Sequence, residues 1–318
     1  FTSSAVGTCH VGRSTEWIPW AVSLTSFSQD HLDFHPTMEA YLAAKCRLAS
    51  EHLRSDGVAV AAVDGQPAAA KFLEAAASGR RWRASQGGLA TAELRASAVE
   101  HSDSGVRAHV DTPAGAIAVH SPLVGAFNLD NLLVAIGLSL GLGIGAEAIE
   151  AAIPSLLGAP GRLERVEPGD GPAVFVDYAH TPDAVERAIE VVRRICSGRL
   201  FVLLGCGGDR DRSKRPIMGR VASVGADRFW ATSDNPRTED PNRILDDMLA
   251  GVPENARHKV VRHSDRAAAI ADAIGTADRT DVVLIAGKGH EDYQVIGTQR
   301  IHFDDREHAL AALQQRRP

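Results

Sequence analysis

Two short polar segments in the second half of this 318-residue chain have the residue types of a ligand site. Residues 234–237 (Asp-Asn-Pro-Arg) set an acid, an amide and a guanidinium around a rigid turn. Arginine pairs bidentately with carboxylate and aspartate pairs with ammonium, so this turn suits a ligand that carries both groups. Residues 287–291 (Gly-Lys-Gly-His-Glu) can add a second carboxylate for an amine. The alternatives are a turn with a surface arginine and a glycine turn that closes a strand.

A third segment, residues 205–215, combines glycines with clustered arginine and lysine (Gly-Cys-Gly-Gly-Asp-Arg-Asp-Arg-Ser-Lys-Arg). Glycines after a strand permit close approach of a phosphate, and the basic side chains neutralise it. The segment is not a Walker A sequence, which needs Gly-Lys-Ser/Thr after four spacer residues. A generic anion loop is the alternative to a specific nucleotide or substrate role.

Two other candidate groups lie in the first half of the chain. Residues 30–35 (Asp-His-Leu-Asp-Phe-His) precede Lys45 on an expected helix. Carboxylates and imidazoles can bind a divalent cation or orient phosphate oxygens, and the alternative is that one of the aspartates caps the helix. Asn128 and Asn131, three residues apart at a helix start, either cap that helix or hydrogen-bond a purine edge.

The elements that must position these residues are clearest in the second half, where short β-branched runs alternate with helical patterns such as 181–196. This alternation is typical of βαβ units around a parallel sheet. Such sheets bind ligands outside the carboxyl ends of their strands, and the polar segments follow the expected strands. Those strands are 173–177, 199–205, 228–233, 259–263 and 281–287.

The first half is less regular, and a linker separates it from the second. Residues 158–161 (Gly-Ala-Pro-Gly) interrupt a helical pattern and precede a new strand. We therefore predict two domains, 1–160 and 161–318. Arg162 and Arg165 follow the linker and either face a cleft or lie in solvent. The expected elements of the first half are a helix from about 37 to 53, strands near 58–63, 107–112 and 116–120, and a helix from 128 to about 142.

Composition narrows the class of protein. The chain has 34 Lys and Arg against 40 Asp and Glu, a formal charge of −6, and so lacks the basic excess of a nucleic-acid binder. No apolar run is long enough to span a membrane and no signal peptide opens the chain, so we expect a cytoplasmic protein. Four scattered cysteines are expected to be reduced thiols. Lysine occurs only five times, so each lysine is retained either by chance or for its chemistry.

Taken in order, these motifs resemble the Mur ligases and, within that family, the MurE type, which adds the third amino acid of the peptidoglycan stem. The resemblance extends from about Gly12 to Leu313. It includes no counterpart of the family's amino-terminal UDP-binding domain or of its phosphate loop. The fold that it implies is α/β, with an incomplete central nucleotide-binding domain followed by a Rossmann-like, doubly wound C-terminal domain. The matching motifs are 29–35, 44–45, 127–128 with Asn131, 161–162, 177–180, 207–211, 234–237 and 287–291.

The resemblance also implies roles for individual residues. His31 and Lys45 would lie at the metal and γ-phosphate site, with Lys45 carbamylated so that it can bind Mg²⁺. The nucleotide would meet Asn128 at the adenine, Arg162 at the phosphates and Asp177 at the ribose, with His180 and Lys214 nearby. The residues that would hold the incoming amino acid are Arg210, Asp234, Asn235, Arg237, Gly287 and Glu291.

The reaction that the resemblance implies joins diaminopimelate to a UDP-N-acetylmuramoyl dipeptide. The Asp-Asn-Pro-Arg segment resembles the diaminopimelate-adding branch rather than the lysine-adding one. ATP and Mg²⁺ would phosphorylate the terminal carboxylate of the dipeptide, and the amine would then attack the acyl phosphate. Two alternatives remain: a ligase for another acid, working with a protein partner that supplies the phosphate loop, and a non-catalytic module that binds nucleotide and amino acid.

Overall fold

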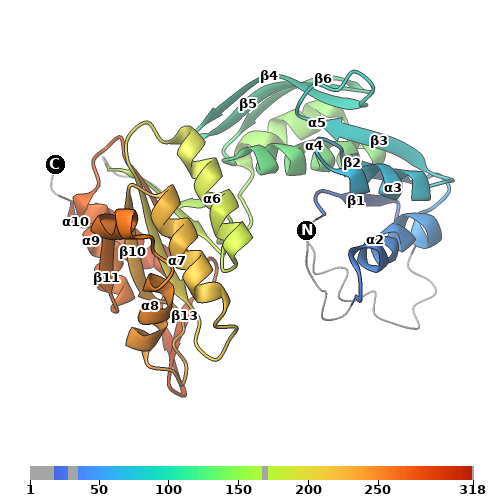
Figure 1. Ribbon diagram of the computed structural model, residues 1–318. Helices are drawn as coiled ribbons and strands as arrows, with labels where there is room; N and C mark the ends of the chain where they lie inside the picture. The colour runs from blue at the N-terminus through green and yellow to red at the C-terminus, as the bar shows by residue number, and fades with distance from the viewer. Residues whose placement is uncertain (1–17, 28–34, 167–170, 317–318) are drawn as a thin grey trace. The chain divides into compact units, whose positions relative to one another are not determined.

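The computed structural model describes residues 18–27, 35–166 and 171–316 of the chain (Figure 1). The chain divides into two compact units, Phe1–Leu156 and Leu157–Pro318. This division falls a few residues before the boundary predicted between residues 160 and 161. Each unit has its own sheet and its own buried core.

The first unit is built on a six-stranded sheet. Its strands, in spatial order, are β1 (Ala21–Leu24), β2 (Val58–Ala62), β3 (Arg80–Ser85), β4 (Leu94–Ser102), β5 (Gly105–Thr112) and β6 (Gly115–Ser121). β1 to β4 pair in parallel, whereas β5 and β6 continue the sheet antiparallel. β2 is buried along its whole length, as expected of a parallel strand that is covered on both faces.

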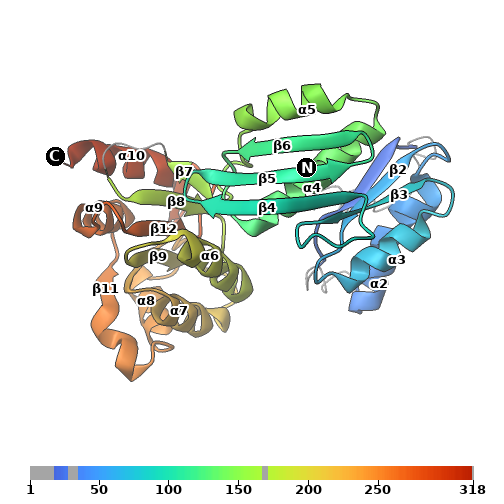
Figure 2. The same ribbon diagram turned by 90° about the horizontal axis from the view of Figure 1, so that it is seen from above.

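Helices cover both faces of this first sheet (Figure 2). They are α2 (Met38–Arg47) with a π-helical turn (Leu48–His52), α3 (Pro67–Ala75), α4 (Ala126–Gly141), α5 (Ala146–Ala152) and a 3-10 turn (Ile153–Ser155). Leu133 of α4 joins the core on one face, and Phe72 of α3 joins the core on the other. α4 approaches β2 so closely that a Cβ on Gly141 would lie 2.2 Å from the Val58 side chain, so glycine is required there.

The second unit contains a doubly wound sheet, which confirms the predicted fold class. Its strands, in spatial order, are β11 (Val260–His263), β10 (Arg228–Ser233), β9 (Leu200–Cys206), β12 (Val282–Ala286), β8 (Ala173–Asp177) and β7 (Glu164–Val166). All neighbours pair in parallel except β7, which is antiparallel to β8. The predicted strands at 173–177 and 228–233 match β8 and β10 residue for residue.

Helices pack against both faces of the second sheet, and a hairpin follows β12. The remaining elements are α6 (Pro182–Ile195), α7 (Lys214–Gly225), α8 (Pro241–Leu249), a 3-10 helix (Glu254–Lys259), α9 (Arg266–Thr276), α10 (Asp305–Gln315) and the hairpin strands β13 (Tyr293–Ile296) and β14 (Gln299–His302). Ile270 of α9 and Leu313 of α10 share one core with Phe201 and Trp230 of the sheet. No helix in the described ranges has the length and apolar character needed to cross a membrane. Cys46, Cys196 and Cys206 carry free thiols, as predicted, and Cys9 lies outside the described residues.

Candidate functional site

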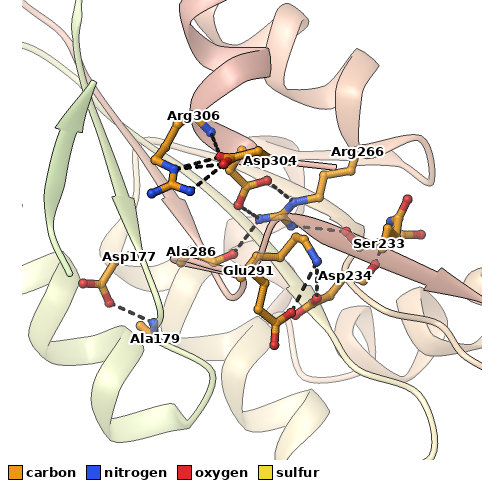
Figure 3. A network of polar contacts seen from close by, with 12 residues as sticks. Asp177, Ala179, Ser233, Asp234, Arg266, Ala286, Glu291, Asp304 and Arg306 are labelled. Carbon is orange, nitrogen blue, oxygen red and sulfur yellow. Dashed lines mark hydrogen bonds and ion pairs between the residues drawn. The ribbon is translucent and has the colours of Figure 1, made fainter. Parts of the chain in front are cut away.

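Polar residues gather where four parallel strands of the second unit end. β8 ends at Asp177, β9 at Cys206, β10 at Ser233 and β12 at Ala286. Because these strands are parallel, their carboxyl ends lie at the same edge of the sheet. This is the edge at which doubly wound sheets bind their ligands. Figure 3 shows polar side chains and hydrogen bonds at this edge.

The loops after β10 and β12 form one buried polar cluster. Asn235 Nδ2 donates a 2.8 Å hydrogen bond to Glu291 Oε2. The ammonium of Lys288 lies 3.4 Å from Glu291 Oε2, 3.4 Å from Asn235 Oδ1 and 3.6 Å from Asp234 Oδ1. Lys288, Asp234 and Asn235 are buried, whereas Glu291 is partly exposed. The two segments singled out separately from the sequence therefore belong to a single site.

A buried arginine links the ends of β10 and β12 (Figure 3). Arg266, the first residue of α9, donates hydrogen bonds to the carbonyl oxygens of Ser233 (3.2 Å) and Ala286 (3.0 Å). Its remaining donors form two 2.7 Å hydrogen bonds with the Asp305 carboxylate. The arginine therefore holds the backbone at the two points where the loops of the cluster begin.

Arg237 completes the turn after β10 and is held in an unusual conformation. Its backbone N–H donates to the Val295 carbonyl oxygen (3.0 Å), and its guanidinium donates to the Gly208 carbonyl oxygen (2.7 Å). Val295 N–H in turn donates to Asn235 Oδ1 (2.9 Å), so β13 braces the turn. The φ angle of Arg237 is +51°, a left-handed conformation that is costly for a residue other than glycine. Strain of this kind persists where the surroundings impose it, which is typical of ligand sites.

The electrostatics of the cluster favour a ligand with a positive group. Burial raises the pKa of the Asp234 carboxyl above its ordinary value, and the positive charges of Arg266 and Lys288 oppose that rise. Glu291 adds a second carboxylate close by, and Arg237 adds a guanidinium at the end of the same turn. Ammonium and carboxylate groups together, as in an amino acid, match this arrangement.

A second group of side chains surrounds Tyr178, the residue after β8. The guanidinium carbon of Arg162 lies 5.1 Å from the centroid of the Tyr178 ring, and the rings of His180 and His290 lie 4.6 Å and 5.0 Å from it. Lys214 Nζ donates a 2.9 Å hydrogen bond to the His180 carbonyl oxygen. The structure thus brings together Arg162, which was predicted to meet the phosphates of the nucleotide, with His180 and Lys214, which were predicted to lie nearby. Cationic side chains beside an aromatic ring suit the phosphates and base of such a ligand.

Gly161 and Gly289 allow the loop 287–291 to pack closely against the residues around Tyr178. Gly161 and Gly289 have φ angles of +65° and +53°. A Cβ on Gly161 would lie 2.0 Å from the backbone nitrogen of His290, and a Cβ on Gly289 would lie 2.5 Å from the Tyr178 Cβ. Glycine is therefore required at both positions. The loop 287–291 consequently contacts the Tyr178 group and also contributes Lys288 and Glu291 to the buried cluster.

Asp177 joins the segment that carries Arg162 to the end of β8. Its Oδ2 accepts a 2.7 Å hydrogen bond from Leu163 N–H, and its Oδ1 accepts a 2.8 Å hydrogen bond from Ala179 N–H. Burial raises the pKa of this carboxyl, although the two hydrogen bonds and the nearby Arg162 and His180 act in the opposite direction. The predicted contact of Asp177 with a ribose remains a prediction.

The basic residues of the glycine-rich segment after β9 have different environments. Arg215 is fully buried and forms ion pairs with Glu239 (2.8 Å) and Asp247 (2.9 Å). The positive charge of Arg215 is therefore neutralised by acidic residues of the protein itself. Arg210, the member of this loop predicted to hold the amino acid, is exposed to solvent. Only part of the positive charge seen in the sequence is thus available to a ligand.

Comparison with known protein families covers both units. Residues 2–139 match the family model described as "Mur ligase middle domain", and residues 161–289 match the one described as "Mur ligase, glutamate ligase domain". The chain belongs to the Mur ligase family. The resemblance inferred from the motifs is thereby confirmed.

Individual relatives of this Mur ligase chain share one name. The present chain is 47% identical over 303 residues to the UDP-N-acetylmuramoyl-L-alanyl-D-glutamate--2,6-diaminopimelate ligase of Nostoc sp. (strain PCC 7120). The match covers 94% of this chain and 60% of that protein. The chain is 50% identical over 297 residues to the ligase of the same name from Synechococcus elongatus, covering 92% and 58%. A solved structure of a ligase with that name superimposes with a TM-score of 0.69 at 37% identity, covering 92% of this chain and 60% of that chain. The chain spans about three fifths of the length of the curated relatives it matches.

Two predicted site residues of the Mur ligase middle domain lie on helices of the first unit. Lys45 is half-buried on α2, and its ammonium lies 4.8 Å from the centroid of the Tyr41 ring. Asn128 lies in the first turn of α4, where its Nδ2 donates a 2.8 Å hydrogen bond to the Val124 carbonyl oxygen. α4 follows Gly125 as its N-cap residue, so the alternative in which an asparagine caps this helix is wrong.

The predicted metal site can be only partly located. His31 lies outside the described residues, so the structure gives no position for it. Among the residues that the structure does describe, no three metal-ligating side chains gather in one place. An ammonium group repels a cation, so Lys45 would bind Mg²⁺ only after carbamylation. The pairing of His31 and Lys45 around Mg²⁺ stays a prediction.

Sequence reasoning assigned no role to three residues that shape the buried cluster, namely Lys288, Arg266 and Asp305. Lys288 had a usable signal, because lysine is rare in this chain and this one lies between two glycines next to a predicted strand end. Arg266 and Asp305 gave no such signal. They are 39 residues apart and come from different helices.

Proposed function

We propose that this chain carries the amino-acid and nucleotide pockets of a ligase that adds diaminopimelate to a UDP-N-acetylmuramoyl dipeptide at the expense of ATP. The observation that supports this most directly is the buried cluster of Asp234, Asn235 and Glu291 with Arg237 at its edge. It offers partners for both charges of an amino-acid head group. The names of the relatives supply the substrate class, and the Tyr178 group suits the phosphates of a nucleotide.

The proposed reaction has two steps. The terminal carboxylate of the dipeptide first takes the γ-phosphoryl group of ATP, forming an acyl phosphate and ADP. The free amine of diaminopimelate then attacks the acyl carbon, loses a proton, and expels inorganic phosphate to leave an amide. In reactions of this type the protein contributes chiefly by positioning the reactants and neutralising charge.

Residues of this chain would bind both the incoming diaminopimelate and the phosphates of ATP. Diaminopimelate carries an amino group and a carboxylate at each end, and the cluster can hold one end while the amine of the other end reacts. Arg162 and Lys214 would bring positive charge to the phosphates. Mg²⁺, when bound, would neutralise the transferred phosphoryl group. Mass spectrometry of gently prepared protein tests the carbamate on Lys45, which would increase the mass by one CO₂.

The deciding experiment measures binding and turnover on the same purified 318-residue protein. Isothermal titration calorimetry with diaminopimelate tests the pocket. Release of phosphate in the presence of ATP, Mg²⁺ and the dipeptide tests the reaction, with diaminopimelate omitted in the control. Diaminopimelate binding is the expected result, and turnover that depends on diaminopimelate would show that this chain catalyses the reaction by itself. Binding without turnover would mean that the phosphate loop must come from outside this chain or that the chain is a binding module, and absence of diaminopimelate binding would overturn the proposal.

A further inference from the structure

Lys288 is fully buried, although a buried ammonium costs several kcal/mol unless its partners replace water. The structure supplies those partners. Besides Asp234, Asn235 and Glu291, the ammonium donates a hydrogen bond to the carbonyl oxygen of Tyr293. Three of the four partners are residues of the proposed amino-acid pocket. The lysine therefore lies beneath that pocket and contacts each of its acidic and amide side chains.

We propose that Lys288 is a positioning residue for this pocket. Its ammonium holds the carboxylates of Asp234 and Glu291 and the amide of Asn235 in the orientation that receives the ammonium group of the incoming amino acid. This inference rests on the proposed function, because it assigns to Lys288 the organisation of the same amino-acid site.

The orientation of the Asn235 amide supports this role. Its Oδ1 accepts from the Lys288 ammonium at 3.4 Å and from Val295 N–H at 2.9 Å. Two donors on one side require an oxygen there, so Nδ2 must point toward Glu291, where it donates at 2.8 Å. Lys288 thus helps to select one of the two possible orientations of the amide.

Glu291 and Asp234 each have a carboxylate oxygen that forms no hydrogen bond within the cluster and can accept one from a ligand. Both contacts of Glu291 with Asn235 and Lys288 use Oε2, so Oε1 can face a ligand. Asp234 Oδ1 is buried and forms an ion pair with the Lys288 ammonium at 3.6 Å, but it has no partner within hydrogen-bond distance among the described residues. A buried acceptor that lacks a donor carries a desolvation cost. The ammonium of a bound amino acid would supply the missing hydrogen bond.

The charge of Lys288 also matches the pocket to its ligand. When both are ionised, Asp234 and Glu291 carry two negative charges, and the charge of Glu291 opposes the ionisation of Asp234. Lys288 reduces their sum to one net negative charge, which matches a single ammonium group.

Gly287 leaves space for the side chain of Asp234 in this cluster, because its φ is +116° and a Cβ there would lie 3.1 Å from Asp234 Oδ2.

The test compares Lys288→Met with Lys259→Met in the full 318-residue chain. Lys259 is a half-buried lysine of the same unit that donates one 3.2 Å hydrogen bond to the Ala226 carbonyl oxygen, remote in sequence from the pocket segments. Calorimetry should show diaminopimelate binding weakened about tenfold or more by Lys288→Met, since charged hydrogen bonds are lost. Lys259→Met should bind like the unaltered chain. Wild-type affinity in a folded Lys288→Met protein would overturn the inference.

A double variant separates positioning from a merely structural role and covers the case in which Lys288→Met does not fold. Lys288→Met with Glu291→Gln removes one cation and one anion together, so less unpaired charge is buried. We expect this protein to bind diaminopimelate several-fold more weakly than Glu291→Gln alone, because Asp234 and Asn235 have also lost their support. Equal affinity of the two would overturn the inference. Absence of binding to the unaltered chain would instead overturn the proposed function, and this inference with it.

Discussion

Arg266 and Asp305 form an ion pair from which water is excluded. Their Nε–Oδ1 and Nη2–Oδ2 distances are both 2.7 Å, and their exposed fractions are 1% and 0%. Arg266 also donates hydrogen bonds to the carbonyl oxygens at the ends of β10 and β12. The packing of α9 and α10 is thereby coupled to the backbone from which the proposed pocket is built.

Asp305→Asn is expected to be strongly destabilising, because it leaves the buried charge of Arg266 without a counter-charge. Removing one partner of such a pair costs about 3–5 kcal/mol in the free energy of unfolding. Urea denaturation measures it. Glu254→Gln is the matched control, since Glu254 pairs with Arg257 at 3.0 Å on the surface. A surface pair contributes less than about 1 kcal/mol, and losses of equal size in the two variants would contradict the prediction.

Arg237→Ala should separate diaminopimelate from lysine as ligands. Diaminopimelate has a second carboxylate that lysine lacks, and Arg237 is the proposed partner of that group. We expect diaminopimelate binding to weaken by about 2–3 kcal/mol, the value of a charged hydrogen bond in a desolvated site. Lysine oriented with its α-amine at the reacting end presents only its side-chain ammonium to the pocket, so its binding should change little.

Calorimetric titration of both amino acids checks the prediction for Arg237. The control is Arg243→Ala, because Arg243 is an exposed arginine of the neighbouring α8. Similar losses for both amino acids would indicate that Arg237 supports the backbone through its bond to Gly208 rather than binding a carboxylate.

Asp130 should make the first unit less stable as pH rises. Burial, followed by repulsion from Asp64, raises the pKa of Asp130 to about 6, against which a 3.0 Å hydrogen bond from Gln86 acts weakly. A carboxyl whose pKa is higher in the folded state than in the unfolded state holds its proton longer on folding. Stability therefore falls between about pH 4 and pH 6 as this proton is lost.

Asp130→Asn should remove the loss of stability that accompanies ionisation of Asp130, because asparagine does not titrate. Relative to the unaltered protein, its free energy of unfolding should increase by about 1–2 kcal/mol between pH 4 and pH 7.5, after allowance for partial exposure to water. Denaturation at the two pH values measures the difference. Glu74→Gln on the exposed side of α3 is the control. A difference between Asp130→Asn and wild type that does not depend on pH would refute the assignment.

Glu239 should act in the opposite direction, at lower pH. Hydrogen bonds from Arg215 lower the pKa of Glu239 to about 2. Its contribution to stability is therefore complete above about pH 4.5 and is lost as pH falls toward 2. Glu239→Gln should destabilise the protein at pH 7 and much less at pH 2.5, as acid and neutral denaturation curves would show. An equal effect at both pH values would be evidence against this ion pair.

Local sequence was sufficient for several elements. β8 and β10 were predicted residue for residue, because a strand buried on both faces is a continuous apolar run bounded by polar residues. α6 lies within one residue of the predicted helix at each end, because its apolar residues recur at helical spacing; in the structure Thr181 caps it and Pro182 is its first residue. β3 was missed. Its sequence, Arg-Arg-Trp-Arg-Ala-Ser, is mostly polar, and it is a strand because β2 and β4 pair with it on both sides.

The sequence by itself determined where the chemistry-bearing segments lie along this Mur ligase chain, since motif, periodicity and turn residues are local properties. The tertiary structure decided which of them share a site. Asn235 and Lys288 are 53 residues apart. They meet because β10 and β12 both pair in parallel with β9, so the loops that follow these two strands begin at the same edge of the sheet. It also decided that Arg215 serves an internal ion pair while Lys288 supports the pocket. Burial and partners, which depend on packing, distinguish two cations that look alike in sequence.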